Sequence, residues 1–471
     1  MISQKLWELL TSFSVYEMNR LRKFILSPYF NEQENLIRLF DIIDDNLRQN
    51  DGSIAKEVIW QQLFPEKGYN DIKMRRLFSD LGQIARRFLA IQSFESDPAS
   101  PFIYLLKACN ERKLNKQFTS LEKKTRSALI GQFSNDEFYL KQFQLENELD
   151  QFKVKQLSRT KTRNLVATDH NLDLFYLVRK LKHYCDALNY KNVLNVEVPI
   201  GLINSLIGEI EAEGLLQYPA IGIYYKIMMT LLEPEAEHHF FDLKRLLNEH
   251  PEIFPQPELI ECYIFAQNYC IKKINAGKSH FSEVLFEVYK ELIEQEVIFD
   301  EGKLAPWHYK NIITLGLRLK AYDWTERFIN ENQPRLPEDR RKNALAYNTA
   351  MLHFHKHEYP KVIEALSQLE YNDVYYAVDG RWLLLKTYYE LSEFEALDSL
   401  LESFRLFLLR QKLISGANKR KYLNLVRYVQ KLSKVNISDK TKINALKARI
   451  DSAKDIAEKD WLQEKVAELV G

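Results

Sequence analysis

The sequence predicts an all-α protein, and three observations support that fold class. Glycine and proline occur only 14 times each in 471 residues, well below their usual shares of about 7% and 5%. Because these residues form most tight turns, the chain is expected to consist of helices joined by short polar loops. Apolar residues recur at three- and four-residue spacing in segment after segment, which is the period of an amphipathic helix. Only one short stretch, 192–201, alternates like an extended segment.

A corner between the second and third predicted helices reads "ILSPYFNEQENL". A helix over 15–26 should end before the proline, because the residue that precedes a proline avoids the helical region. Asn31 followed by Glu34 predicts a variant of the capping box, which would begin the next helix over 32–48. Phe30, just before that cap, is expected to fold onto the following helix as a hydrophobic staple. The stretch is therefore interpreted as a structural corner, with a binding pocket for its aromatic residues as the alternative.

The stretch from Asn70 to Gln92 predicts a long amphipathic helix with one basic side. Its apolar stripe follows helical spacing and comprises Met74, Leu77, Phe78, Leu81, Ile84, Ala85, Phe88 and Leu89. The opposite side carries Lys73, Arg75, Arg76, Arg86 and Arg87. A basic second helix is compatible with a helix-turn-helix reader of nucleic acid, but the third element is missing, so a solvated face is the favoured interpretation.

Two seams divide the chain into three predicted parts. One is "FESDPASP" at 94–101, which has the composition of a linker, and the other is the alternating stretch at 192–201. The parts are an N-terminal helical domain over 1–97, a helical middle region over 101–191 and an α-solenoid over 199–471. Helices in the middle region are expected at 101–111, 114–130, 135–157 and 165–189.

Composition favours a soluble, cytoplasmic protein. No run of 18 apolar residues occurs, so a membrane span is not expected. The first thirteen residues read as an amphipathic helix with Glu8 inside it, where a signal peptide would be apolar. The four cysteines lack paired spacing and are interpreted as reduced thiols; they are Cys109, Cys185, Cys262 and Cys270.

Three turns in the C-terminal part share an acid followed by an aromatic residue. The aromatic residues stand 35 positions apart in both intervals, and the pairs are Asp323-Trp324, Glu358-Tyr359 and Glu393-Phe394. Nine positions before each aromatic lies a small or apolar residue: Leu315, Ala350 and Leu385. Self-similarity with a period of about 20–50 residues is typical of stacked helix pairs.

This pattern resembles the tetratricopeptide (TPR) family, whose unit of about 34 residues is a helix–turn–helix. The resemblance covers about 305–410, and its clearest unit is 347–370, where the family's small first-helix residue falls on Ala350. The family's closing proline is absent after the second and third units. The small residue of the family's second helix is replaced by Arg327, Val362 or Leu397. The resemblance implies an α-solenoid architecture for this part of the chain.

The resemblance also implies a concave surface lined by the first helix of each unit. By the family pattern its ligand-facing positions fall on Ile312, Gly316, Leu319, Tyr347, Met351, Phe354, Trp382, Lys386 and Tyr389. Exposed aromatic and methionine side chains in a groove suit an extended or helical peptide, so the last six of these residues form the predicted peptide-binding site. The alternative is that the side chains pack against neighbouring repeats.

A second candidate surface is basic. The interval 403–438 holds nine Lys or Arg residues and no Asp or Glu. On a helix predicted over 417–435, the side opposite the apolar stripe carries Arg420, Asn424, Arg427, Lys431 and Lys434. This basic ridge is suited to phosphate or to an acidic protein surface, such as the segment 197–302 with its net charge of −12. A solvated outer face is the alternative.

No segment matches a catalytic or metal-binding signature. "NAGKSH" at 275–280 ends like a phosphate loop, but Lys272 stands where the first glycine is required. His353 and His357 lie four positions apart on one helical face, yet a third metal ligand is not expected, because Glu358 should point elsewhere. Neither an enzyme activity nor a metal or other cofactor is therefore predicted.

These observations predict a non-catalytic protein–protein interaction scaffold, which binds a peptide or protein segment through its helical-repeat groove. The alternative is a nucleic-acid-associated protein that uses the basic ridge at 403–438. The expected partner is therefore a protein or peptide, with a nucleic acid or an acidic protein surface as the second choice. Neither a membrane nor a small-molecule substrate is indicated.

Overall fold

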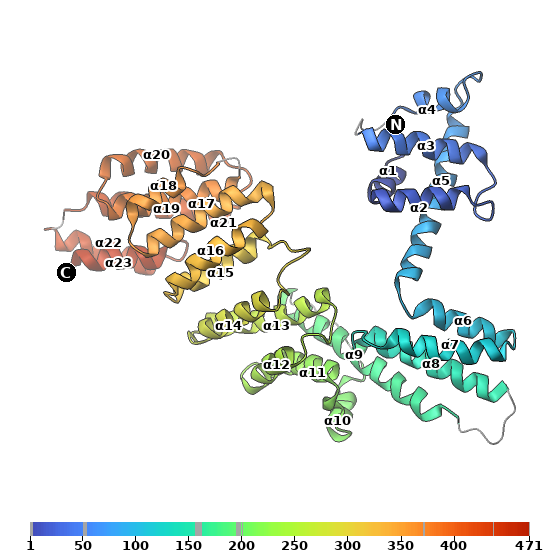
Figure 1. Cartoon of the computed structure of the whole chain (residues 1–471). Helices are drawn as coiled ribbons and strands as arrows, with labels where there is room; N and C mark the ends of the chain where they lie inside the picture. The colour runs from blue at the N-terminus through green and yellow to red at the C-terminus, as the bar shows by residue number, and fades with distance from the viewer. Residues whose placement is uncertain are drawn as a thin grey trace. The chain divides into compact units, whose positions relative to one another are not determined.

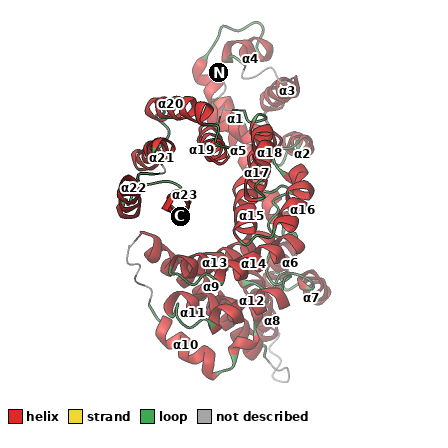
Figure 2. Cartoon of the chain, turned by 90° about the vertical axis from the view of Figure 1, so that its left-hand side faces the viewer, coloured by secondary structure: helices red, strands yellow, loops and turns green. Residues whose placement is uncertain are grey.

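The protein is predominantly helical in the part that its structure, a computed structural model, describes (Figure 1). The described residues are 3–49, 54–155, 163–194, 199, 201–370, 373–436 and 438–470. Over these ranges there are 23 α-helices, two short 3₁₀ helices and no strand, and helices account for 78% of the residues (Figure 2). The prediction of an all-α protein is confirmed. None of the described helices combines the length and the hydropathy that a membrane crossing needs.

The chain forms two compact units, Met1–His183 and Tyr184–Gly471. The first unit contains α1 (Gln4–Thr11), α2 (Val15–Leu26), α3 (Glu34–Gln49), α4 (Lys56–Leu63), α5 (Asp71–Ser96), α6 (Ser100–Glu111), α7 (Asn115–Leu129), α8 (Asp136–Lys155) and most of α9 (Leu165–Leu194). The unit boundary falls inside α9. Residues 192–194 belong to that helix, so the extended segment predicted at 192–201 is wrong at its start, and 195–198 lie outside the described residues.

The second unit contains a longer series of helices. They are α10 (Ile203–Ala212), α11 (Pro219–Leu232), α12 (His238–Glu249), α13 (Gln256–Asn275), α14 (Phe281–Glu294), α15 (Pro306–Arg318), α16 (Tyr322–Asn332), α17 (Glu338–His355), α18 (Tyr359–Leu366), α19 (Val374–Glu390), α20 (Phe394–Arg410), α21 (Gly416–Lys434), α22 (Lys440–Ser452) and α23 (Lys459–Val470). Two 3₁₀ turns, Leu215–Gln217 and Gln333–Arg335, lie between them.

The long helix α5 organises the N-terminal part of the first unit, since α1, α2, α3 and α4 all pack against it. Its buried residues are Met74, Leu77, Phe78, Leu81, Gly82, Ala85 and Phe88. Ile84 is half-buried and Leu89 is exposed, so the predicted apolar stripe is confirmed along most of its length and wrong at Leu89. A separate apolar core joins α6, α7 and α8 around Leu106, Phe118 and Leu145.

Helix starts follow from local capping. Ser14 and Glu17 form a capping box before α2: the Ser14 N–H donates to Glu17 Oε2 at 2.7 Å, and the Glu17 N–H donates to Ser14 Oγ at 3.3 Å. Asn70 caps α5 by accepting from the Lys73 N–H at 2.9 Å. Other helices, such as α15 with Pro306, have proline in the first turn, where its missing N–H costs nothing.

The corner between α2 and α3 differs from its sequence prediction, because α3 begins at Glu34 and Asn31 does not cap it. The Asn31 Oδ1 accepts from the Gln33 N–H at 2.9 Å, and its Nδ2 donates to the carbonyls of Ile25 and Gln33, both at 3.1 Å. The predicted capping box is therefore wrong. Asn31 instead pairs with a carbonyl that the last turn of α2 leaves without a helical partner.

Phe30 packs backwards on α2 rather than forwards on α3, so the predicted staple is also wrong. Its ring stacks on Phe24 with centroids 3.8 Å apart, and the Arg87 guanidinium lies 4.8 Å from the Phe30 centroid. The adjacent Tyr29 is 80% exposed, and a pocket of about 360 Å³ lies beside the Phe24–Phe30 pair. The contacts of Asn31 and Phe30 thus hold the corner together, while Tyr29 and the pocket leave one side of it exposed.

The three helix pairs of 305–410 are joined by turns of one kind. In each, the second residue after the first helix has a positive φ: Lys320 at 58°, His357 at 60° and Ser392 at 58°. The N–H of the next residue donates to the carbonyl five positions earlier at 2.9 Å; the pairs are Ala321 to Gly316, Glu358 to His353, and Glu393 to Tyr388. This long hydrogen bond is characteristic of the Schellman motif at a helix C-terminus.

These turns correct the register of the first predicted repeat. In the second and third units, the acid–aromatic pair directly follows the residue with positive φ, as Glu358-Tyr359 and Glu393-Phe394. In the first unit the pair at that place is Ala321-Tyr322, which lies two positions before Asp323-Trp324. The left-handed residues are 37 and then 35 positions apart, so the constant spacing of the aromatic residues is misleading in the first interval. The buried second-helix position of the first unit is accordingly Thr325, at 0% exposure, rather than Arg327.

Helices of the second unit pack in chain order. Within 305–410 each helix contacts the next, and the first helices α15, α17 and α19 also contact one another. One continuous apolar core runs from α17 to α23. The helix pairs therefore lie where the repeats are predicted, with the first shifted in register by two residues, whereas the solenoid arrangement and membership in the TPR family stay predictions.

Candidate functional site

The predicted peptide-binding residues lie on α17 and α19, and the structure brings them together in one core. Tyr347, Trp382 and Lys386 are 3%, 7% and 8% exposed. The other three, Met351, Phe354 and Tyr389, are half-buried and pack against the same core. The expectation of exposed side chains is therefore wrong here. Other parts of the chain cover these side chains, and a ligand could reach them only if the covering segment moved away.

Part of the cover is the chain's own last described helix, α23, which contacts Lys386, Tyr389 and Glu390 and packs also on α22 and α21. The Trp461 ring lies edge-on to Tyr389, with centroids 5.4 Å apart and planes at 84°, and its Nε1–H donates to Glu390 Oε1 at 2.8 Å. Just before α23, Glu458 accepts a hydrogen bond from Lys386, with Nζ and Oε2 2.9 Å apart. An aromatic contact and two polar contacts therefore hold α23 against α19.

Lys386 is the cation at the centre of this contact. Its Nζ lies 4.8 Å from the ring centroid of Phe354, 5.2 Å from that of Trp382 and 5.5 Å from that of Trp461. Aromatic faces attract a cation, and more strongly where water is excluded. A buried charge still needs an opposite charge, which Glu458 supplies. Glu458 and the neighbouring rings thus satisfy the buried charge of Lys386.

A second buried cation anchors α23 from its own side. The Lys465 side chain is 8% exposed, and its Nζ lies 3.1 Å from Glu390 Oε2 and 2.8 Å from Glu468 Oε1. Burial by itself lowers the pKa of Lys465, but hydrogen bonds to Glu468 and Glu390 outweigh it, so the pKa lies above its ordinary value. The residue is therefore charged at neutral pH, and Glu390 receives both it and the Trp461 indole.

The first repeat does not contribute to this surface as predicted. Ile312 is 0% exposed, and Gly316 marks the closest approach of α15 to α16: a Cβ built on it would lie 2.4 Å from Thr325 Oγ1. Leu319 is half-buried at the end of α15. The prediction that Ile312 and Gly316 face a ligand is wrong. The error of two residues in the register assigned the wrong face of α15 to the predicted groove.

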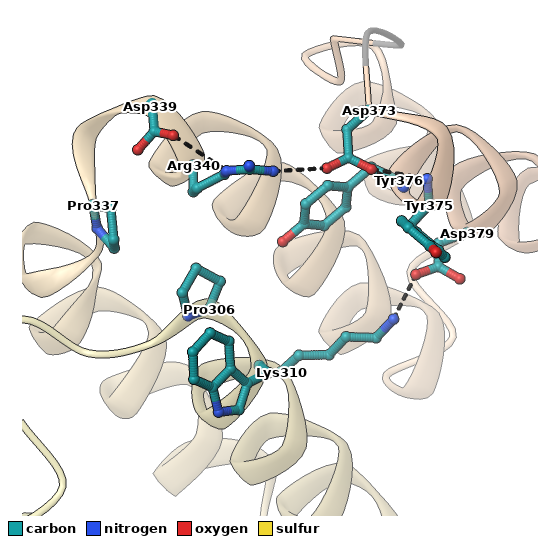
Figure 3. A pocket seen from close by; sticks show the side chains of 10 residues that line it. Pro306, Lys310, Pro337, Asp339, Arg340, Asp373, Tyr375, Tyr376 and Asp379 are labelled. Atoms are coloured by element: carbon teal, nitrogen blue, oxygen red, sulfur yellow. Dashed lines mark hydrogen bonds and ion pairs between the residues drawn. The ribbon is translucent and has the colours of Figure 1, made fainter. Parts of the chain in front are cut away.

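An open pocket of about 570 Å³ lies where α15, α17 and α19 begin (Figure 3). Trp307 and Tyr375 are 66% and 68% exposed, and Trp307 is the only one of the six tryptophans that is exposed. The pocket is lined by Pro306, Trp307, Lys310, Pro337, Asp339, Arg340, Asp373, Tyr375, Tyr376 and Asp379. Exposed aromatic rings in a hollow are the kind of surface that anchors protein partners.

The charged groups of the pocket are paired with one another. Figure 3 shows Arg340 between Asp339 and Asp373, and Lys310 reaching Asp379. Arg340 Nη1 lies 3.0 Å from Asp373 Oδ2, and Asp373 also caps α19 by accepting from the Tyr375 N–H at 2.8 Å. These pairs fix the walls and leave the rings of Trp307 and Tyr375 for a ligand. The pocket therefore presents two exposed aromatic rings between walls that ion pairs hold in place.

The basic ridge predicted on α21 is partly paired. Lys434 Nζ lies 3.3 Å from Asp398 Oδ2, and Arg420 Nε lies 4.0 Å from Asp455 Oδ2. Arg427 and Lys431 make no ion pair within the described ranges, and Arg427 is exposed. Burial lowers the pKa of Lys431, and the nearby charges of Arg427 and Arg449 lower it further. Arg449 belongs to α22, so two helices bring like charges together.

His353 and His357 both contact protein groups, but only His353 lies on α17, so the prediction that the two share one helical face is wrong. His353 Nδ1 lies 2.6 Å from Glu358 Oε2, so the expectation that Glu358 points elsewhere is wrong. His357 sits in the turn after the helix, where its Nδ1 lies 2.9 Å from the Tyr359 hydroxyl. Over the described part of the chain, no three or more His, Cys, Asp or Glu residues are grouped to hold a metal ion. In the stretch 275–280, Asn275 ends α13 and 276–280 form the connection to α14.

Sequence reasoning missed Trp307, Tyr375 and the whole contribution of α23. Trp307 follows Pro306 in the first turn of a helix, and that position is the one signal that could have marked it. The buried residues Trp461, Leu462, Lys465 and Val466 follow helical spacing, but periodicity does not say which surface they meet. No protein-family model, curated protein or solved structure matches this chain.

Proposed function

We propose that this protein is a non-catalytic scaffold for protein–protein interaction, which binds a peptide or protein segment on the helical repeats of 305–410. The observation that carries the proposal is the open pocket at the starts of α15, α17 and α19, with Trp307 and Tyr375 exposed in it. Tryptophan and tyrosine are the residues most enriched at the energetic centres of interfaces. Repeated helix pairs, in turn, supply a rigid platform for them.

The same proposal includes a cytoplasmic location. All four cysteines are free and buried, and burial raises the pKa of the Cys270 thiol to about 12. A thiol with such a pKa stays protonated and unreactive at neutral pH. Reduced, buried thiols are ordinary in a reducing compartment, whereas secreted proteins of this size usually pair their cysteines.

Partner capture by the full-length chain tests the proposal. Wild type and a Trp307→Ala/Tyr375→Ala variant serve as baits in lysates with and without nuclease. We expect at least one protein that wild type retains after nuclease treatment and that the variant retains at least about fivefold less. This corresponds to about 1 kcal/mol of binding free energy, a typical loss when a contact aromatic is truncated.

A matched control comes from the first unit. Tyr16 and Tyr29 are 71% and 80% exposed, so Tyr16→Ala/Tyr29→Ala removes comparable aromatic surface elsewhere and should leave capture unchanged. Equal capture by all three baits would exclude the pocket as the binding surface. Loss of capture with the control alone would instead assign partner binding to the N-terminal corner.

The crowding of Arg427, Lys431 and Arg449 favours the second candidate, binding of nucleic acid on the basic ridge. Arg427→Glu/Lys431→Glu should then weaken binding of a duplex oligonucleotide and reduce the slope of log affinity against log salt by about 2. Lys123→Glu/Lys124→Glu on α7 makes the same charge change at exposed positions elsewhere. Equal affinities for wild type and both variants would leave the ridge as a solvated face.

A further inference from the structure

The last described helix presents a compact set of contact groups. Glu458 stands just before α23, Trp461 and Leu462 follow three and four positions later, and Lys465 and Val466 follow one turn after those. All four of these helical residues are buried. Asp460 on the other side is exposed, and Glu464 and Glu468, whose carboxylates lie beside Lys465, are exposed as well. α23 is therefore an amphipathic helix with an acid before its apolar face.

The surface beneath α23 matches this set group by group. Lys386 pairs with the acid, Glu390 receives both the indole N–H of Trp461 and the ammonium of Lys465, and Tyr389 meets the Trp461 ring. All three surface residues lie within one turn of α19. Such a match of charge, hydrogen bond and ring contact is the pattern of helix-in-groove recognition.

We infer that the α17–α19 surface is a binding site for an amphipathic helix of this chemistry, and that α23 occupies it in cis. The partner class is a protein segment with an acidic residue three positions before an aromatic–aliphatic pair and a basic residue four positions after the aromatic. Such a segment binds by displacing α23, so the two compete. The inference rests on the proposed function and names the partner class.

Two features make α23 a replaceable occupant. It follows α22 through the segment 453–458 rather than a tight turn, and a competing helix of the same chemistry can take over the contacts that α23 makes with α22 and α21. Glu458 itself has φ of 53°, a left-handed conformation that is strained for a residue other than glycine. Release of α23 relieves that strain. A partner helix whose preceding residue has an unstrained backbone binds without this strain energy.

A charge-swap experiment on the full-length chain tests the inference. The probe is a fluorescent peptide with the sequence of 454–470, in its native form and as Glu458→Lys. Glu458→Lys in the chain turns the cis ion pair with Lys386 into a repulsion and removes no apolar contact. This variant should bind the native peptide at least about tenfold more tightly than wild type does, because its site is unoccupied for a larger fraction of time.

The reciprocal variants make the result specific. A Lys386→Glu chain should bind the Glu458→Lys peptide and reject the native one. The double variant Glu458→Lys/Lys386→Glu regains an ion pair in cis, so it should again exclude the native peptide. Asp460→Lys is the matched control, since this residue is exposed on the same helix and its reversal should leave peptide binding at the wild-type level.

Hydrogen exchange of 459–470 and the size of the particle complete the test. The inference predicts faster exchange in the Glu458→Lys chain and unchanged monomer size. Faster exchange without peptide binding would overturn it, since the vacated surface would then not be a helix site. Unchanged exchange would show that the ion pair does not hold α23. If two chains formed a dimer by exchanging α23, the partner helix would be the α23 of a second copy of the chain. Capture through Trp307 and Tyr375 is measured separately and can hold in each of these cases.

Discussion

Asn31 shows how one buried amide holds a corner. Its side chain is 8% exposed and uses both of its polar ends: the oxygen accepts from Gln33, and the nitrogen donates to Ile25 and Gln33. The Ile25 carbonyl lies in the last turn of α2, where it has no helical partner. A buried carbonyl without a donor is costly, so the amide ties the end of one helix to the approach of the next.

Asn31→Ala is therefore expected to lower the free energy of unfolding of the first unit by about 1–3 kcal/mol, the usual cost of an unsatisfied buried group. Asn31→Asp keeps the oxygen that accepts from Gln33 but cannot donate to Ile25, so it should be destabilised as well. Urea denaturation followed by circular dichroism measures both variants. A wild-type midpoint for Asn31→Asp would show that the bond to Ile25 contributes nothing.

Truncation of two tryptophans in the repeats is expected to affect stability in different ways. Trp382 is 7% exposed and Trp307 is 66% exposed. Trp382→Ala should cost about 3–5 kcal/mol of stability, as the truncation of a buried large side chain does, whereas Trp307→Ala should stay within about 0.5 kcal/mol of wild type. Urea denaturation of both variants checks this. Similar losses for the two would mean that the Trp307 pocket is closed in solution.

The surface of α17 and α19 was predictable in position but not in exposure, and the pocket of Trp307 and Tyr375 was not predicted. Helical spacing places Tyr347, Phe354, Trp382 and Tyr389 on one side of successive first helices, and they do share one core. What covers them depends on contacts between residues 71 and 72 positions apart, Glu390 with Trp461 and Lys386 with Glu458. Local periodicity carries no information on such pairings, so a sequence pattern can propose a groove without showing that it is filled.

The turn is the element that sets the repeat register. Lys320 and Ser392 are exposed and have left-handed backbones, and glycine is the residue that adopts this conformation most readily at a helix C-terminus. Lys320→Gly and Ser392→Gly should each stabilise the second unit by about 0.5–1 kcal/mol, because the relieved strain exceeds the added freedom of the unfolded chain. Thermal unfolding measures the gain. Lys320→Ala keeps the strain and should give none.

Helix positions were more predictable than helix connections. α2 begins and ends at the predicted residues because a capping box and a Ser-Pro dipeptide mark its ends. α3 begins at Glu34 rather than at 32 because Asn31 prefers a local turn to the capping role. Asp323-Trp324 misled the repeat alignment because an acid beside an aromatic is common by chance, whereas the positive φ of Lys320, which fixes the turn, leaves no mark in the sequence.

The molecule as a whole should unfold in two steps. Its two compact units have separate apolar cores, one set around α1–α8 and another from α17 to α23. In calorimetry, Asn31→Ala should lower one transition and Trp382→Ala the other, and the double variant should show both shifts unchanged, as distant sites do. A single transition that moves with either variant would show that the units unfold together.

The four buried thiols allow the opening of each unit to be measured separately. Cys109 is 1% exposed in the first unit, and Cys185, Cys262 and Cys270 are each 0% exposed in the second. An alkylating reagent cannot reach a buried thiol, and burial also raises the pKa of the thiols of Cys185 and Cys270, so labelling must wait for the surrounding helices to open. The mass of each labelled peptide then records how often its part of the chain opens under native conditions, without any mutation or denaturant.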